Sequence, residues 1–399
     1  MKKWNKLERR LVVYSSIFFC LYVFIALSST LVDISELEKS PSPFGVDFAV
    51  YYTAGQMIRS EESTNIYNMK EHHYLLEEIM DRNMPFALPW VYPPTFLLAV
   101  VPFSFLPYYI SLALWLLSTF VLAIYAMYLL VPKAKLLVFI TFGFPGVLLN
   151  LRWGQNGFLN TALLGFGICF LETNPMISGI MFGLLTYKPQ IALFPFVILL
   201  LAKKWRPLLW SIFFAVINVV ISVLVFGYST WIDFFNNFFN SSSLLLTSVW
   251  EDTAAIQPTV YSTFRIWGVE GINLQIILSI IAVISTMFCL WTWKKTDRTS
   301  LKGTVLIIGI FLTMPYYVQY DLMILSIPCV LLAYDFFQHG YFLYEIILLG
   351  VLWCMPLINW PLVAFTGIQI NPIVLFLVLT LVYFRVSGVS KRCTSTNVF

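Results

Sequence analysis

The sequence predicts an all-α polytopic membrane protein with about twelve transmembrane helices. Apolar residues make up 59% of the 399-residue chain and charged residues only 11%, and the mean hydropathy is +0.82. Several apolar runs approach the roughly 20 residues that a helix needs to cross a bilayer. The connections between most of these runs are short, so spans use nearly all of the chain. We therefore expect one integral membrane domain over residues 1–399.

The first apolar run follows five basic residues among the first ten. We interpret it as a transmembrane helix that starts in the cytoplasm, because it is too long for a signal core and no small-x-small cleavage site closes it. The predicted spans are 11–32, 108–131, 136–150, 157–171, 176–187, 190–202, 208–227, 272–293, 303–317, 322–337, 341–357 and 372–386.

Two long loops are expected on the extracytoplasmic side. The first, 33–107, contains possible amphipathic helices at 48–60 and 69–81. Its last part, 94–107, is apolar but short and interrupted by Pro102, so we expect a re-entrant segment there. The second large loop covers 228–271.

The distribution of Lys and Arg gives the orientation. Alternating the spans places most of the basic residues, and both termini, on the cytoplasmic face. The protein is therefore predicted to be a multi-pass component of the cell membrane with both of its long loops on the extracytoplasmic side.

Asp47 is the acidic side chain around which the predicted site is built. It lies in the apolar and aromatic segment 44–56, and such surroundings raise the cost of ionising a carboxylate. At a membrane surface a carboxylate of this kind is a candidate general base. The alternative is a helix cap, because Asp47 precedes a predicted helix and could accept hydrogen bonds from its first free amides. The sequence leaves both roles open.

Three cations on the predicted outer side could hold an anionic substrate group. Arg152 lies between two short spans, Lys188 at another turn, and Arg265 at the mouth of a later span. Their guanidinium and ammonium groups suit the phosphate of a lipid, although each could instead anchor independently in the head-group layer. Gln155 and Asn156 favour substrate binding for Arg152, because a glycine-flanked amide pair at a membrane turn has little use in packing.

Two further stretches add aromatic and acidic candidates. Tyr92, in a Tyr-Pro-Pro sequence, could form a wall on which a sugar stacks, although interfacial belts also place tyrosines at this depth. Tyr320 and Asp321 begin a late apolar run, where Asp321 could pair with an outer cation or cap its helix. No histidine or cysteine pattern and no outer Asp-x-Asp predicts a metal site, so we expect no metal and no other cofactor.

Taken in order, these motifs resemble glycosyltransferase family 87 of the GT-C superfamily. The motifs are Asp47-Phe-x-x-Tyr51-Tyr52-x-Ala-Gly, Tyr92-Pro-Pro, Gly154-Gln155, Lys188-Pro and Pro315-Tyr-Tyr…Asp321. The resemblance implies a multi-span enzyme in which Asp47 is catalytic, with a polyprenyl-phosphate-linked donor sugar, commonly mannose, and an inverting transfer. Many relatives carry a histidine in the late outer stretch, whereas residues 314–321 contain none.

The predicted function is transfer of a hexose from a polyprenyl-phosphate donor to an extracytoplasmic glycolipid or glycan acceptor. Asp47 would accept the proton of the acceptor hydroxyl, while Arg152, Lys188 or Arg265 would stabilise the departing phosphate. We expect Tyr51, Tyr52, Tyr92, Gln155, Asn156, Tyr320 and Asp321 to bind substrate. The expected partners are this donor, the acceptor and membrane lipids, and the small net charge of +4 indicates no nucleic-acid partner.

The main alternative is a secondary transporter or lipid flippase, because short spans broken by Pro and Gly also mark transport sites. A transporter should carry ionisable groups near the membrane midplane and show repeat symmetry. Here the polar residues collect at the predicted outer ends and no repeat is evident. A catalytically idle scaffold is a third alternative that the sequence leaves open.

Overall fold

The computed structural model describes residues 6–35, 43–60, 66–84, 88–238 and 256–388, and within these ranges it is all-helical, without a strand. The helices, in chain order, are α1 (Lys6–Ser35), α2 (Val46–Arg59), α3 (Met69–Met80), η2 (Pro94–Phe96), α4 (Leu97–Val100), η3 (Val101–Phe105), α5 (Tyr108–Leu130), η4 (Lys135–Val138), α6 (Phe139–Phe142), α7 (Gly146–Trp153), α8 (Gly157–Phe170), α9 (Pro175–Leu184), η5 (Leu185–Tyr187), α10 (Pro189–Leu201), α11 (Trp205–Phe226), α13 (Val260–Ile266), α14 (Gly271–Lys295), α15 (Thr299–Thr313), η7 (Gln319–Leu325), α16 (Ser326–His339), α17 (Leu343–Thr366) and α18 (Asn371–Ser387).

Six helical segments of the described chain are long and apolar enough to cross a membrane. A seventh is added if the bent pair Lys135–Phe142 and Gly146–Trp153, which meet at 53°, forms one span. Helices occur at all the predicted positions, but the predicted number of twelve full spans is not confirmed, because α8, α10, α15 and others are apolar yet too short. The six segments that are long and apolar enough to cross a membrane are Arg9–Leu31, Tyr108–Leu130, Trp205–Phe226, Gly271–Lys295, Gln319–His339 and Leu343–Thr366.

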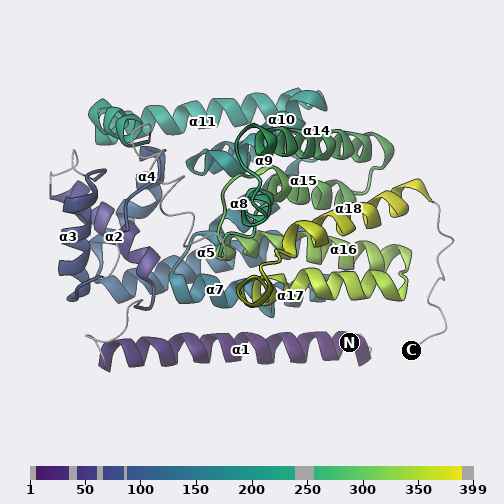
Figure 1. Cartoon of the computed structure of the whole chain (residues 1–399), viewed down its shortest axis with the longest axis horizontal. Helices are drawn as coiled ribbons and strands as arrows, with labels where there is room; N and C mark the ends of the chain where they lie inside the picture. The colour runs from purple at the N-terminus through teal and green to yellow at the C-terminus, as the bar shows by residue number, and fades with distance from the viewer. Residues whose placement is uncertain (1–5, 36–42, 61–65, 85–87, 239–255, 389–399) are drawn as a thin grey trace.

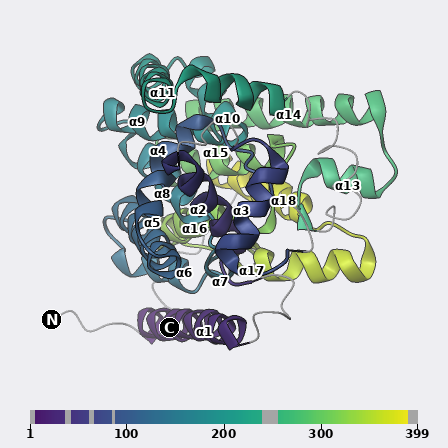
Figure 2. The same cartoon turned by 90° about the vertical axis from the view of Figure 1, so that its left-hand side faces the viewer.

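The long helices differ sharply in how deeply they lie in the bundle. Figures 1 and 2 both place α1 along one side and α11 along the opposite side. Only 17% of the apolar window of either helix is buried, against 83% of the window in Gln319–His339. The peripheral helices therefore offer apolar faces to lipid, while η7 and α16 form the centre of the protein.

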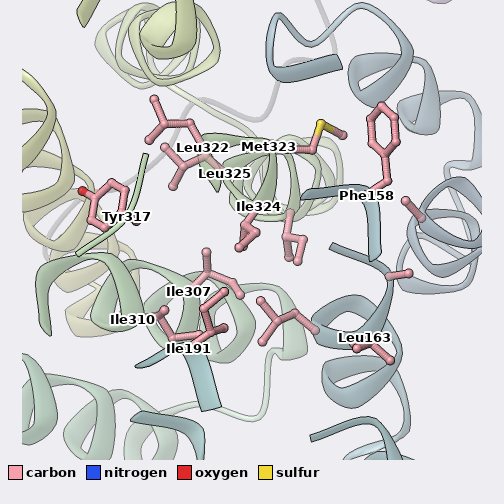
Figure 3. Close-up of a cluster of buried hydrophobic side chains, with 14 of the residues drawn as sticks. Phe158, Leu163, Ile191, Ile307, Ile310, Tyr317, Leu322, Met323, Ile324 and Leu325 are labelled. Carbon is pink, nitrogen blue, oxygen red and sulfur yellow. The ribbon is translucent and has the colours of Figure 1, made fainter. Parts of the chain in front are cut away.

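The central core lies where α8, α10, α15 and η7 meet. Figure 3 shows Phe158, Ile191 and Ile307 in one cluster of buried side chains with the consecutive apolar residues Leu322–Leu325. All of these side chains are fully buried. Because η7 is packed on all sides, the residues at its start are held in fixed positions, and this matters for the site.

The first loop region forms a packed cap at one end of the bundle, on the left in Figure 1. A helix occurs at the predicted position 48–60, but its amphipathic character is not confirmed. Ten of the fourteen residues of α2 are buried, because α2 is enclosed by α3, α5 and the segment Pro94–Phe105. By contrast, α3 buries the single face formed by His72, Leu76 and Met80. The predicted re-entrant segment consists of the short elements η2, α4 and η3 in succession.

Candidate active site

Four helices begin at one place near this cap. The residues that precede their first turns are Gly45 for α2, Asn156 for α8, Lys188 for α10 and Val318 for η7. Hydrogen bonds between side chains at these four starts, described below, hold them together. Helix starts carry unpaired amides and a partial positive charge, so this arrangement favours negative charge between them.

Two glycines allow α2 to begin directly against the end of α7. Gly45 and Gly154 have φ angles of 75° and 71°, which favour glycine. A Cβ atom on Gly154 would lie 2.6 Å from Cβ of Phe48 and 3.3 Å from Cα of Gly45. The Gly45 amide donates to the carbonyl of Arg152 at 3.0 Å. This close contact brings Asp47 beside the turn that carries Gln155.

Asp47 lies in the first turn of α2 and does not cap it, because Gly45 occupies the cap position. Its Oδ2 accepts a hydrogen bond from Nε2 of Gln155 at 2.8 Å. Burial raises the pKa of Asp47 from 3.8 to about 6, although the Gln155 hydrogen bond and the charges of Lys188 and Arg152 act to lower it. A half-buried carboxylate with this pKa can accept a proton near neutral pH.

The amide of Gln155 is itself oriented by a network of hydroxyl and amide groups. Its Oε1 accepts from the Tyr51 hydroxyl at 2.6 Å, which leaves its amino group to face Asp47. Nδ2 of Asn156 donates to the hydroxyls of Tyr51 and Tyr92, both at 3.0 Å. Burial raises the pKa of both tyrosines, so their hydroxyls stay protonated and available as donors.

Lys188 and Asp321 form a buried ion pair at the same site. Nζ of Lys188 lies 2.7 Å from Oδ1 of Asp321, and each residue is only 4% exposed. Oδ2 of Asp321 also accepts from the backbone amide of Val318 at 3.3 Å. Asp321 therefore both pairs with a cation and caps η7, so the two alternatives left open by the sequence hold together.

The structure brings Arg152 to this site but not Arg265. The guanidinium of Arg152 donates to the carbonyl of Pro43 at 2.9 Å, and its charge acts on Asp47. Arg265 lies in α13 and forms an ion pair with Glu270. No contact in the described ranges joins Arg265 to Asp47.

Two of the predicted tyrosines take different positions. The hydroxyl of Tyr52 donates to the carbonyl of Leu106 at 2.8 Å, which ties α2 to the end of η3. The ring of Tyr320 lies 5.5 Å from Nζ of Lys188. Tyr320 thus borders the ion pair, whereas the hydroxyl of Tyr52 serves packing of the first loop.

Two residues of this network, Asn160 and Tyr187, are not among the candidates predicted from the sequence. Nδ2 of Asn160 contacts Asn156 at 3.2 Å and Asp321 at 3.5 Å, and its Oδ1 accepts from the Tyr187 hydroxyl at 2.5 Å. The signal for Asn160 was its place four residues after Asn156 in an apolar helix, where a polar side chain is costly without a partner. In the part of the chain that is described, no group of three or more His, Cys, Asp or Glu residues could hold a metal ion.

The fold and the site define a helical membrane protein with carboxylate, cation and amide groups gathered at one end of its bundle. The sequence model of glycosyltransferase family 87 matches residues 90–315, more than half of the chain. The chain therefore belongs to glycosyltransferase family 87, which confirms the resemblance seen in its motifs and makes the protein a glycosyltransferase. No curated protein and no solved structure matches it significantly.

The family match covers part of the site. Tyr92, Gln155 and Lys188 lie inside the matched range, whereas Asp47 and Asp321 lie outside it. The family match therefore assigns no role to these two carboxylates, and the geometry of the site is the observation that bears on them.

Proposed function

We propose that the protein transfers a hexose, with mannose as the first candidate, from a polyprenyl-phosphate donor to a glycolipid or glycan acceptor. The observation that carries this proposal is the position of Asp47, a carboxylate with a raised pKa beside the cations Lys188 and Arg152. The choice of mannose and of the polyprenyl donor rests on the family resemblance. The starts of α2, α8, α10 and η7 at the same place support an anionic leaving group there.

In the proposed reaction the sugar is transferred in one displacement. The acceptor hydroxyl loses its proton to Asp47 while its oxygen forms a bond to the anomeric carbon of the donor. The bond from that carbon to the phosphate oxygen breaks, and the lipid monophosphate leaves with the electron pair. Lys188 and Arg152 offset the charge that develops on this phosphate. A single displacement inverts the anomeric carbon, and the proton on Asp47 then passes to water.

The remaining candidates take distinct parts in this proposal. Gln155 holds the carboxylate of Asp47, and Tyr92 and Tyr320 form the aromatic borders of the sugar site. A monophosphate leaving group can be neutralised by side-chain cations, so the proposal needs no metal.

We further propose that the site lies on the extracytoplasmic side of the cell membrane and that both termini are cytoplasmic. The support is the excess of Lys and Arg in the connections that the alternation of the twelve predicted spans places inside. Membership of a glycosyltransferase family favours this function over a transporter or flippase.

The test is sugar transfer by the purified protein in vesicles that contain a membrane lipid extract. Radiolabelled polyprenyl-phosphate mannose and the corresponding glucose compound are supplied as donors, and any labelled product is identified. We expect Asp47→Asn to reduce transfer by about 10²- to 10⁴-fold, the usual contribution of a general base.

The matched control is Asp81→Asn, another carboxylate of the first loop region. Asp81 is exposed and has a positive φ of 50°, a conformation that Asn tolerates. Asp81→Asn should transfer sugar like the wild type. Wild-type turnover by Asp47→Asn would remove Asp47 from the mechanism, and transfer from a nucleotide sugar in place of the lipid donors would overturn the proposed donor.

A further inference from the structure

An apolar cavity of about 350 Å³ lies between α1 and α5. This volume is within the roughly 300–1,000 Å³ range of ligand pockets. Its lining includes Ala26 of α1, Ala113 and Leu117 of α5, and Leu151 of α7. Two of its walls are thus helices that are long and apolar enough to cross a membrane, and α1 is the less buried of the two. An occupant of this cavity must therefore be apolar and can come from the bilayer.

The cavity is a groove with one end closed. Phe19 and Phe120 stack at 5.3 Å between ring centroids, and the edge of Phe142 packs against both. From Phe19 to Thr30 the groove follows α1 for roughly 16 Å at about 1.5 Å per residue. This is about half of the roughly 30 Å hydrocarbon core of a bilayer. The groove therefore has the depth of a single leaflet.

The other end of the groove leads to the candidate active site. Phe44 and Leu151 line this end. The next residues along the chain are Gly45 and Arg152, whose backbone groups share a hydrogen bond of 3.0 Å. Asp47 follows in the first turn of α2. A chain lying in the groove would therefore place its polar end beside Arg152 and Asp47.

We propose that this groove binds the donor lipid, taking the isoprene units next to its phosphate. The inference rests on the proposed function and adds a binding site to it. A volume of about 350 Å³ spread over this length accommodates a single chain, which fits a polyprenyl phosphate better than a two-tailed phospholipid. The cation at the open end matches its phosphate. Because Phe19 and Phe120 close the groove, the remainder of a long polyprenyl chain leaves it sideways between α1 and α5.

Photolabelling of the full-length protein in vesicles tests this proposal without any sugar transfer. The probe is farnesyl monophosphate that carries a photoreactive group on its chain, and labelled peptides are mapped. We expect labels on α1 and α5 within the groove. Unlabelled farnesyl and full-length polyprenyl monophosphate should compete within about threefold of each other, because the groove holds only the units near the phosphate.

Two variants fill the groove, Ala113→Trp and Leu117→Trp. Both residues line the groove on α5, Ala113 is exposed and Leu117 is 61% exposed. Each should reduce labelling at least tenfold. The matched control is Leu114→Trp, since Leu114 is 42% exposed on the same helix and does not line the groove. This control should label like the wild type.

Three outcomes would overturn the proposal. The first is labelling outside the groove. The second is displacement of the probe by phosphatidylglycerol that is as effective as displacement by polyprenyl monophosphate. The third is normal labelling of both Ala113→Trp and Leu117→Trp. The first two would assign the groove to another lipid or to none. Normal labelling with no sugar transfer would refute the proposed function alone, whereas transfer by a wild-type protein that does not label the groove would refute this inference alone.

Discussion

Two clusters of buried charged residues lie at opposite ends of the central segment Gln319–His339, and they differ in how fully their carboxylates are paired. Asp321, at the start of this segment, belongs to the candidate active site. Asp335, near its end, belongs to a second cluster that joins α15, α16, α17 and α18. Each cluster contains two carboxylates and two cations of Lys or Arg.

The carboxylates of the second cluster are closely surrounded by donors. Nε of Arg385 lies 2.6 Å from Oδ2 of Asp335. Oδ1 of Asp335 accepts hydrogen bonds from Arg298 at 3.3 Å and from the Ser300 hydroxyl at 3.2 Å. A guanidinium nitrogen of Arg385 also lies 2.5 Å from Glu345. His339 lies 3.3 Å from the same Oδ1 of Asp335. Because Asp335 and Arg385 are almost completely buried, this cluster holds four helices and offers little access to a substrate.

Asp47 is paired much less fully. Within the described ranges, the Gln155 amide is the hydrogen-bond donor to its carboxylate, and the cations Lys188 and Arg152 act on it as nearby charges. Burial therefore dominates, and the pKa of Asp47 rises to about 6. The comparison teaches that a fully paired buried carboxylate stabilises the fold, whereas an incompletely paired one is prepared to take up a proton.

Arg385→Met should give the largest effect. It leaves Asp335 and Glu345 buried without their shared cation, and breaking a buried ion pair costs about 3–5 kcal/mol. We expect a large drop in the thermal midpoint in detergent and a faster loss of folded protein at a fixed temperature, with activity falling only in step with the folded fraction.

Asp47→Asn provides the contrast in the same assay. Because the folded pKa of Asp47, about 6, is higher than the ordinary value of 3.8, stability falls as the pH rises between these two values, and the full cost of ionising Asp47 is present above about 6. The neutral amide removes this cost, so the thermal midpoint at neutral pH should stay the same or rise while activity is lost. Equal destabilisation by the two substitutions would contradict the distinction between the clusters.

The helices could be placed from the sequence, but their depth in the bundle could not. Apolar runs located α1, α5 and α11 because spans that face lipid are long and continuous. The shorter α8, α10 and α15 gave the same apolar signal, yet they depend on neighbours that the sequence does not identify. The α2 helix shows the same limit. Its sequence predicts a possible amphipathic helix, whereas the burial of most of its residues comes from the packing of neighbours such as α3 and η3 on it.

The candidate site shows a similar division. Asp47, Lys188 and Gln155 were proposed because charged and amide groups are costly at a membrane surface, and the structure brings all three together. Arg265 met the same criterion, but its neighbour Glu270 pairs with it. Which polar groups meet depends on the turns between helices, so the sequence could supply the candidates and not their partners.

Lys188→Gln should have an intermediate effect on donor use and on stability. It tests whether the Lys188–Asp321 pair takes part in catalysis or serves, like the Arg385–Asp335 pair, to hold helices together. Loss of the cation beside the leaving phosphate should lower kcat/KM for the lipid donor by about 10- to 100-fold, or roughly 1.4–2.8 kcal/mol. The protein should also become less stable, because Asp321 is left buried without its cation.

The double variant Lys188→Gln with Asp321→Asn separates the two roles. Removing both charges should restore the thermal midpoint, whereas use of the donor should remain weak. If the double variant regained donor use along with stability, Lys188 would be a structural residue like Arg385.

Gln155→Leu should have the smallest effect, on the pH dependence of transfer. A base must be deprotonated to act, so wild-type kcat/KM should rise with pH through about 6 and fall away below it. The Gln155 hydrogen bond favours the charged form of Asp47, so its removal should raise the pKa of Asp47. The acidic side of the pH profile of kcat/KM should then move to higher pH by up to roughly one unit, or about 1.4 kcal/mol. The control is Tyr52→Phe, which removes a hydroxyl bonded to the Leu106 carbonyl and should leave the acidic side of the profile in place. An acidic side unchanged in Gln155→Leu would mean that Gln155 does not tune the base, and the contrast between an incompletely paired Asp47 and a fully paired Asp335 would then rest on burial alone.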